Sequence, residues 1–121
     1  MNLQELQNHL KIATPALYRV ENGKVIKYEI LVHKKGKKKT ADVSDIAKDG
    51  TFSVAFSKPS NWKPDYALPF ISVMGLDEKT GKLKVEKSER KGGYDLPGRF
   101  FWEDGDFFLS EENANRFINK K

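Results

Sequence analysis

The stretch L17-Y-R-V-E-N-G-K-V-I-K-Y28 places Asn22-Gly23 between two runs of residues that favour β-strands. Asparagine and glycine both tolerate the positive φ angles of a type I′ turn, so this arrangement predicts a two-residue β-hairpin. Such a turn fixes the register of the two strands. Val20 is then expected to oppose Val25, and Leu17 is expected to oppose Tyr28.

This register sorts the side chains onto two faces, because successive residues of a strand point to opposite sides of the sheet. We expect the core on the face that carries Leu17, Ile26, Tyr28, Ile30 and Val32. The opposite face is mixed in polarity and carries Tyr18, Val20, Val25, Lys27, Glu29 and Leu31. Its apolar members need partial cover, either from a helix or from a partner.

Helix signals lie at both ends of the chain. Asn2 can cap a helix over about residues 2–12, and Ser110 can cap a last helix. The expected apolar stripes are Leu3, Leu6 and Leu10 in the first helix and Ala114, Phe117 and Ile118 in the second. Proline at position 15 ends the first helix, because the residue before a proline avoids the helical region.

Alternating apolar residues between the two helices predict further strands, at 40–46, 51–56, 70–76 and 82–87. The segments 57–69 and 88–99 are expected to be loops, since the first holds three prolines and the second is polar and contains glycine. Asp104-Gly105 predicts a second hairpin, which would pair Trp102 with Phe107 and Phe101 with Phe108.

These elements predict a single domain over residues 1–121. Its fold class is α+β: an antiparallel, mostly meander sheet or small barrel of about seven strands, with an N-terminal and a C-terminal helix. The aromatic content of 12 % favours a folded core, because disordered chains are poor in the large residues that drive collapse.

The composition excludes several classes of protein. The chain has no cysteine, so disulfides and thiolate chemistry are ruled out, as are cysteine-ligated metal sites. The opening residues 1–10 do not pair a basic leader with an apolar stretch, so no secretory signal is expected. Since no apolar run approaches the roughly 20 residues that cross a bilayer, no membrane partner is expected either. We expect a cytoplasmic protein, located in the host cell cytoplasm if it is viral.

Motifs for catalysis are weak. His9 and His33 have no motif partner nearby, so we interpret both as surface residues. Glu89-Arg90-Lys91, with Asp77 upstream, matches part of a metal-dependent nuclease pattern, but it lies in a polar stretch rather than on a buried strand. The chain contains neither Gly-x-Ser-x-Gly nor a phosphate-binding glycine loop. We therefore expect no catalytic residue, no metal site and no cofactor.

Basic residues form the most concentrated candidate site. Residues 34–99 carry fifteen of the 22 basic residues and nine of the 17 acidic ones. One set is Lys34, Lys35, Lys37, Lys38 and Lys39, and a second is Lys82, Lys84, Lys87, Arg90 and Lys91. Phosphate binding needs charge density more than fixed geometry, because it is driven by counterion release. The predicted partner is nucleic acid or an acidic protein surface, although the same lysines could serve only to keep a strand edge solvated.

A second candidate surface is apolar and aromatic, and would bind a protein partner. Its members are Tyr18, Val20, Val25, Trp62 and Tyr66. Two of them lie in the proline-containing loop at 57–69, and the others lie on the mixed face of the first hairpin. An apolar patch ringed by charge is typical of a contact site.

The segments Y18-R-V-E-N-G-K-V25 and F107-F-L-S-E-E-N-A114 resemble small phage and prophage proteins. Those proteins often pair an x-V-x-N-G-K-V hairpin with a helix that starts F-L-(S/T)-E-E-x-A. The resemblance implies an accessory viral protein that binds a host or viral macromolecule, and it transfers no catalytic residue.

The sequence thus favours a small non-enzymatic binding protein whose basic surface engages nucleic acid or a nucleoprotein complex. The alternative is a phage-encoded modulator that binds a host protein through the apolar patch. A metal-dependent nuclease is the third hypothesis.

Overall fold

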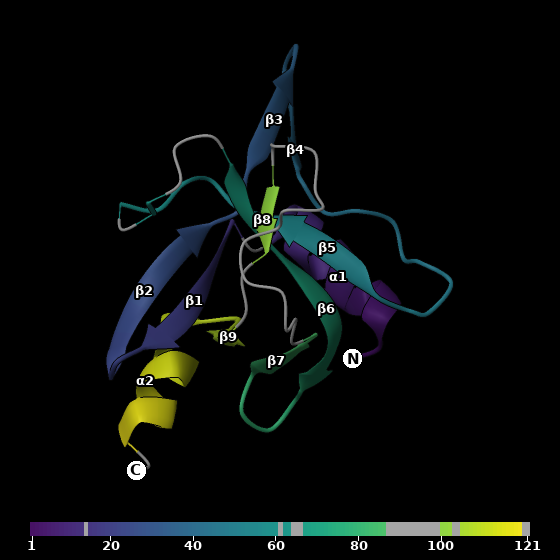
Figure 1. Ribbon diagram of the computed structural model, residues 1–121. Coiled ribbons are helices and arrows are strands. Elements are labelled where there is room, and N and C mark those ends of the chain that lie inside the picture. Colours follow the sequence, from purple (N-terminus) through teal and green to yellow (C-terminus); the bar gives the residue numbers. More distant parts are fainter. Residues whose placement is uncertain (14, 61, 64–66, 87–99, 103–104, 120–121) are drawn as a thin grey trace.

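The computed structural model describes residues 1–13, 15–60, 62–63, 67–86, 100–102 and 105–119. Helix α1 (Leu3–Ile12) and helix α2 (Glu111–Asn119) lie at the two ends of the chain, with a curled, mainly antiparallel sheet between them (Figure 1). The fold class is α+β with a helix at each end, as the sequence predicts, and the main sheet has the form of a half-barrel.

Within the described residues, six strands follow one another across the main sheet in the order β2-β1-β9-β7-β6-β5. Their bounds are β1 Ala16–Glu21, β2 Lys24–Glu29, β5 Phe52–Ala55, β6 Leu68–Asp77, β7 Lys82–Val85 and β9 Asp106–Phe108. Strand β8 (Phe100–Trp102) pairs with β6 in parallel. A separate two-stranded sheet consists of β3 (Val32–Lys35) and β4 (Lys38–Ala41).

The first hairpin has the predicted turn and register. Asn22 and Gly23 both adopt positive φ angles, of 52° and 76°, as a type I′ turn requires. Val20 opposes Val25 and Leu17 opposes Tyr28. The hairpin therefore presents Leu17 and Tyr28 to the interior, where both side chains are buried.

The two outermost strands of the sheet, β2 and β5, meet just beyond their ends. Ile30 and Phe56 form an antiparallel bridge, and the Ser57 amide donates to the Glu29 carbonyl at 2.8 Å. This contact curls the sheet into a half-barrel. The interior of the half-barrel is closed by α1, whose Leu6 and Leu10 are buried in the core.

Three aromatic rings form the centre of the core, and they come from three strand segments far apart in the sequence. The Phe56 and Phe107 rings are stacked, with centroids 5.7 Å apart and an interplanar angle of 4°. Tyr28 presents an edge-to-face contact to both, at 5.3 Å from Phe56 and 5.4 Å from Phe107. Edge-to-face and offset-stacked rings are the favourable aromatic geometries, so this cluster ties β2, the end of β5 and β9 together.

Arg19 also lies on the inner face, because it opposes Ile26, although the core face predicted from the sequence does not include it. Its Nη1 donates to the Tyr28 hydroxyl at 3.1 Å. The guanidinium carbon lies 6.0 Å from the Tyr28 ring centroid and 5.9 Å from that of Phe107. A hydrogen bond and two ring faces thus surround a charge that would otherwise be costly to bury.

Helix α2 supplies the cover that the opposite face of the hairpin needs. Tyr18 pairs with Phe108, so their side chains share the outer face, and the Phe108 ring lies 5.2 Å from that of Phe117 in α2. The helix packs on β1, β2 and β9. Its start is capped as expected, because the Ser110 Oγ accepts a hydrogen bond from the Asn113 amide at 3.2 Å.

The second predicted hairpin is wrong. Residues 103–104 lie outside the described residues, but β8 and β9 on either side of them do not pair in the predicted register. Strand β8 runs along β6, whereas β9 lies between β1 and β7. Both edges of β9 are occupied, one by β1 and the other by β7, so β8 has no free edge of β9 to pair with. In this position Phe107 packs in the aromatic centre beside Tyr28 and Phe56.

Two further boundaries differ from the prediction, and a third prediction is not tested. Val32 is 41 % exposed rather than in the core, because the chain leaves the main sheet at Ile30. The strand predicted at 40–46 ends at Ala41, and only a bridge from Val43 to Val54 follows it. The loop predicted at 88–99 lies outside the described residues.

Hydrogen bonds in the turn before β5 change the pKa of Asp49. The Thr51 hydroxyl and amide donate to Asp49 Oδ1 at 2.7 Å and 3.1 Å. These two bonds, first from the side chain and then from the backbone, lower the pKa of the exposed Asp49 carboxyl. The turn leads into β5, whose Phe52 and Val54 are buried in the core.

We predict that Tyr28→Phe destabilises the protein by roughly 1–3 kcal/mol, because Arg19 then loses a hydrogen-bond acceptor in the interior. Tyr18→Phe is the matched control, since no hydrogen bond to the Tyr18 hydroxyl is seen among the described residues. It should change stability by less than about 0.5 kcal/mol. Urea unfolding measures both, and equal midpoints would contradict the role given to the Tyr28 hydroxyl.

Candidate nucleic-acid interface

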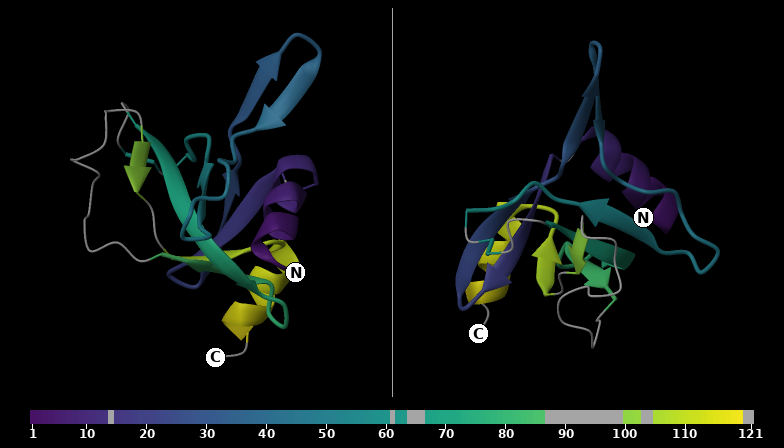
Figure 2. Two further views of the ribbon diagram at one scale, coloured as in Figure 1. Left: turned by 90° about the vertical axis from the view of Figure 1, so that its right-hand side faces the viewer. Right: turned by 45° about the horizontal axis from the view of Figure 1, so that its top comes forward.

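The lysine-rich segment forms a hairpin of its own, which we call the lysine arm (residues 32–41, strands β3 and β4). It projects from the body of the protein (Figures 1 and 2). Gly36 occupies the first position of its two-residue turn with a φ angle of 65°, a conformation that favours glycine. The sequence Lys-Lys-Gly-Lys-Lys thus folds as a turn flanked by two charged strand ends.

The register of the arm places lysine opposite lysine. Lys34 opposes Lys39, and Lys35 opposes Lys38. Residues directly opposite in a β-pair share a face, whereas neighbours along a strand point to opposite faces. Each face of the arm therefore carries one lysine pair, and Lys37 lies at the tip. All five side chains are exposed.

The charge of the arm is not neutralised within the described residues. No carboxylate there lies within 4.0 Å of an arm lysine, and neither arm strand contains an acidic residue. The first carboxylate after the arm, Asp42, contacts His33 instead, with 2.8 Å between Asp42 Oδ2 and His33 Nε2. Like charges directly opposite destabilise a β-pair, so the arm holds its lysines together against their repulsion.

A triangle of backbone hydrogen bonds holds the root of the arm. The Leu31 amide donates to Ala55 O at 2.9 Å, the Asp42 amide to Leu31 O at 2.8 Å, and the Ala55 amide to Asp42 O at 3.1 Å. Leu31 and Asp42 flank the arm on either side, and Ala55 belongs to β5. Both ends of the arm are therefore tied to the main sheet, next to the bridge between Ile30 and Phe56.

A shallow groove of about 170 Å³ lies where the arm meets the end of α1. Its lining consists of Leu10, Lys11, Ile12, Pro15, Val32, Lys39 and Ala41. Ile12 is 86 % exposed. The sequence pattern does not predict this groove, because it places Val32 in the core. Ile12 is the available indication, since it is apolar but lies outside the apolar stripe of the first helix.

The second predicted basic set does not join the first. Lys82 Nζ lies 2.8 Å from Asp106 Oδ1 and 5.3 Å from the Phe117 ring centroid, so its charge is engaged within the fold. Lys84 is exposed on β7. Strand β7 and the arm lie at opposite ends of the molecule in both Figures 1 and 2. The other members, Lys87, Arg90 and Lys91, lie outside the described residues.

The predicted protein-binding residues are not brought together as an open patch. Tyr18, Val20 and Val25 are half-buried, on the face over which α2 packs. Trp62 is half-buried too, and its Nε1 donates to the Ala67 carbonyl at 2.7 Å. The last member, Tyr66, lies outside the described residues.

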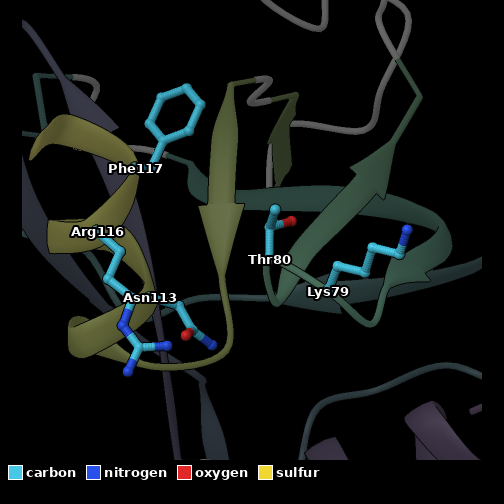
Figure 3. A pocket seen from close by; sticks show the side chains of 5 residues that line it. All are labelled: Lys79, Thr80, Asn113, Arg116 and Phe117. Atoms are coloured by element: carbon cyan, nitrogen blue, oxygen red, sulfur yellow. The ribbon is translucent and has the colours of Figure 1, made fainter. Parts of the chain in front are cut away.

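A small hollow lies between α2 and the turn from β6 to β7 (Figure 3). It is lined by Lys79, Thr80, Asn113, Arg116 and Phe117 and has a volume of about 80 Å³. Arg116 Nη2 already lies 2.7 Å from Glu112 Oε1, and the Lys79 side chain extends away from α2 in Figure 3. The hollow is too small for more than a few water molecules.

The nuclease hypothesis gains no support from geometry. Asp77 Oδ1 accepts a hydrogen bond from the Lys79 amide at 3.0 Å, which is the role of a turn residue. Glu89 and Lys91 lie outside the described residues. In the part of the chain that the structure describes, no three His, Cys, Asp or Glu side chains gather as metal ligands would.

No described helix is long and apolar enough to span a bilayer.

We predict that Lys39→Glu strengthens the arm, because it turns a repulsive cross-strand pair with Lys34 into an attractive one. Such pairs contribute roughly 0.2–1 kcal/mol, so the cross-strand amides of β3 and β4 should exchange up to about fivefold more slowly with solvent. Lys48→Glu changes the net charge equally without facing a lysine, and should leave that exchange unchanged. If both variants slow exchange alike, the effect comes from net charge and not from the pair.

Comparisons with known proteins assign no family to this chain. No protein-family model, no curated protein and no solved structure matches it. The resemblance to phage and prophage proteins therefore stays a prediction.

Proposed function

We propose that the protein is a non-enzymatic binding protein whose lysine arm engages nucleic acid through the phosphates. The observation that carries this proposal is the set of five exposed arm lysines, none of which has a carboxylate partner among the described residues. Phosphate contacts release condensed counterions, and this gain grows with the number of unpaired cations that reach the backbone.

The chemistry of lysine supports binding to the backbone without base readout. Its ammonium is a compact point charge, whereas arginine presents a planar fork that matches phosphate or guanine in two places. Contacts to phosphate position a protein but carry no sequence information. We therefore expect an affinity that depends strongly on salt and weakly on base sequence.

A purely solubilising role explains the arm less well. Alternating lysine and glutamate would place just as many charged side chains on the strand edges. Opposite charges facing each other would also stabilise the pairing of the two strands. The arm instead places Lys34 against Lys39 and Lys35 against Lys38. These facing lysines destabilise the hairpin, and a function that needs concentrated positive charge accounts for them.

The two other hypotheses have less support. A modulator that binds a host protein would use Tyr18, Val20 and Val25, but these side chains are half-buried on the face over which α2 packs. A metal-dependent nuclease would need Asp77 as a ligand, and its carboxylate serves the turn before β7.

We predict that replacing the five arm lysines by glutamine weakens binding to a mixed-sequence DNA by at least about thirtyfold at 0.1 M salt or below. The control variant replaces five exposed lysines elsewhere and has the same net charge. These control positions are Lys24, Lys27, Lys48, Lys63 and Lys79. Fluorescence anisotropy should show a loss of no more than about threefold for the control. Equal losses in the two variants would mean that net charge, and not the arm, attracts the nucleic acid.

A further inference from the structure

We infer that the lysine arm enters the major groove of B-form duplex DNA and contacts the phosphates of both strands. This inference rests on the proposed function and names the class of nucleic acid. It follows from three properties of the arm: the charge on its two faces, its dimensions, and the residue types that it lacks.

The charge on both faces matches a binding site with two walls. Lys34 and Lys39 point to one side of the arm, and Lys35 and Lys38 point to the other. A flat or one-sided polyanion can contact only one of these pairs at a time. A groove has a phosphate backbone along each wall, so an arm placed inside it uses both pairs at once.

The dimensions of the arm fit the major groove. The groove is about 12 Å wide and about 8.5 Å deep, and it admits a two-stranded β-ribbon. Each arm strand has four residues, which corresponds to a length of roughly 13 Å. The arm is therefore long enough to place Lys37 at the floor of the groove while its root stays on the body. The minor groove, about 6 Å wide, is too narrow for such a ribbon in undeformed DNA.

The residue types that the arm lacks argue against other nucleic acids. Residues 32–41 read V-H-K-K-G-K-K-K-T-A and contain no Phe, Tyr or Trp on which unpaired bases could stack. They contain no Asn or Gln to pair with adenine, and their lysines offer guanine a point charge instead of the planar fork of Arg. Single strands and specific sequences are thus poor targets. Duplex RNA is a poor target because its major groove is deep and narrow.

The test compares three probes of one mixed sequence by fluorescence anisotropy: a duplex DNA, a duplex RNA and a single-stranded DNA. We expect the duplex DNA to bind at least tenfold more tightly than the other two at about 0.15 M salt. A duplex DNA with bulky groups on the C5 atoms of its thymines, which project into the major groove, should bind at least tenfold more weakly.

Two double variants test whether both faces are used: Lys34→Gln with Lys39→Gln, and Lys35→Gln with Lys38→Gln. Each removes two cations from one face, so each should make the negative slope of log K against log salt shallower by about 1.8. The charge-preserving pair Lys35→Arg with Lys38→Arg should keep the slope of the original protein. Amide exchange of the arm strands checks that the hairpin persists in every variant.

The outcomes separate the inference from the proposed function. Equal affinity for all three probes, or a slope that depends on only one of the two faces, overturns entry into the major groove but leaves phosphate binding in place. Salt-independent or absent binding of every probe overturns the proposed function itself. A preference for the unmodified duplex DNA, with similar slope changes from the two faces, supports both.

Discussion

The contact of Tyr28 with the stacked rings of Phe56 and Phe107 is the interaction on which the rest of the structure depends. It joins strand segments that lie far apart in the sequence, and it lies where the edges of the sheet approach one another. The bridge between Ile30 and Phe56 forms beside it. Without this packing, β2 and β5 would remain two separate open edges of the sheet. The root of the lysine arm, which is bonded next to this contact, would then lose its fixed position.

The arm depends on this closure because its root is held by the same edge strand. Ala55, next to Phe56, accepts from Leu31 and donates to Asp42, so the chain enters and leaves the arm at one clamped point. The orientation of the arm is therefore set by the core, and it does not rely on attraction between the arm strands. Because the arm strands do not have to stabilise the fold, the arm can carry facing lysines. In a strand pair on which the fold depended, these like charges would reduce stability.

How far the sequence predicts the structure depends on the range of the interaction. The Asn22-Gly23 hairpin and the caps at Asn2 and Ser110 are local, and all three are confirmed. The placement of β9 between β1 and β7 is not local, and the predicted Asp104-Gly105 hairpin fails because Phe107 packs in a core that only the whole chain defines. The alternation of the hairpin strands predicts Val32 in the core, but this alternation ends at Ile30, where the sheet closes, and Val32 is exposed.

The candidate site shows the same division. Composition is enough to single out the lysines at 34–39, but their arrangement in facing pairs follows from the turn at Gly36. That no carboxylate among the described residues contacts them is visible only in three dimensions. Position in the fold also separates these cations from others. Arg19 serves the aromatic centre, Lys82 contacts Asp106, and Arg116 contacts Glu112. Arg116 and Glu112 are exposed and four residues apart in the last helix, so the sequence alone indicates that pair. The partners of Arg19 and Lys82 come from distant segments, so they are known only once the chain is folded. Among the described residues, the arm concentrates positive charge that no carboxylate contacts, and this contrast is why we propose it as the site that binds nucleic acid.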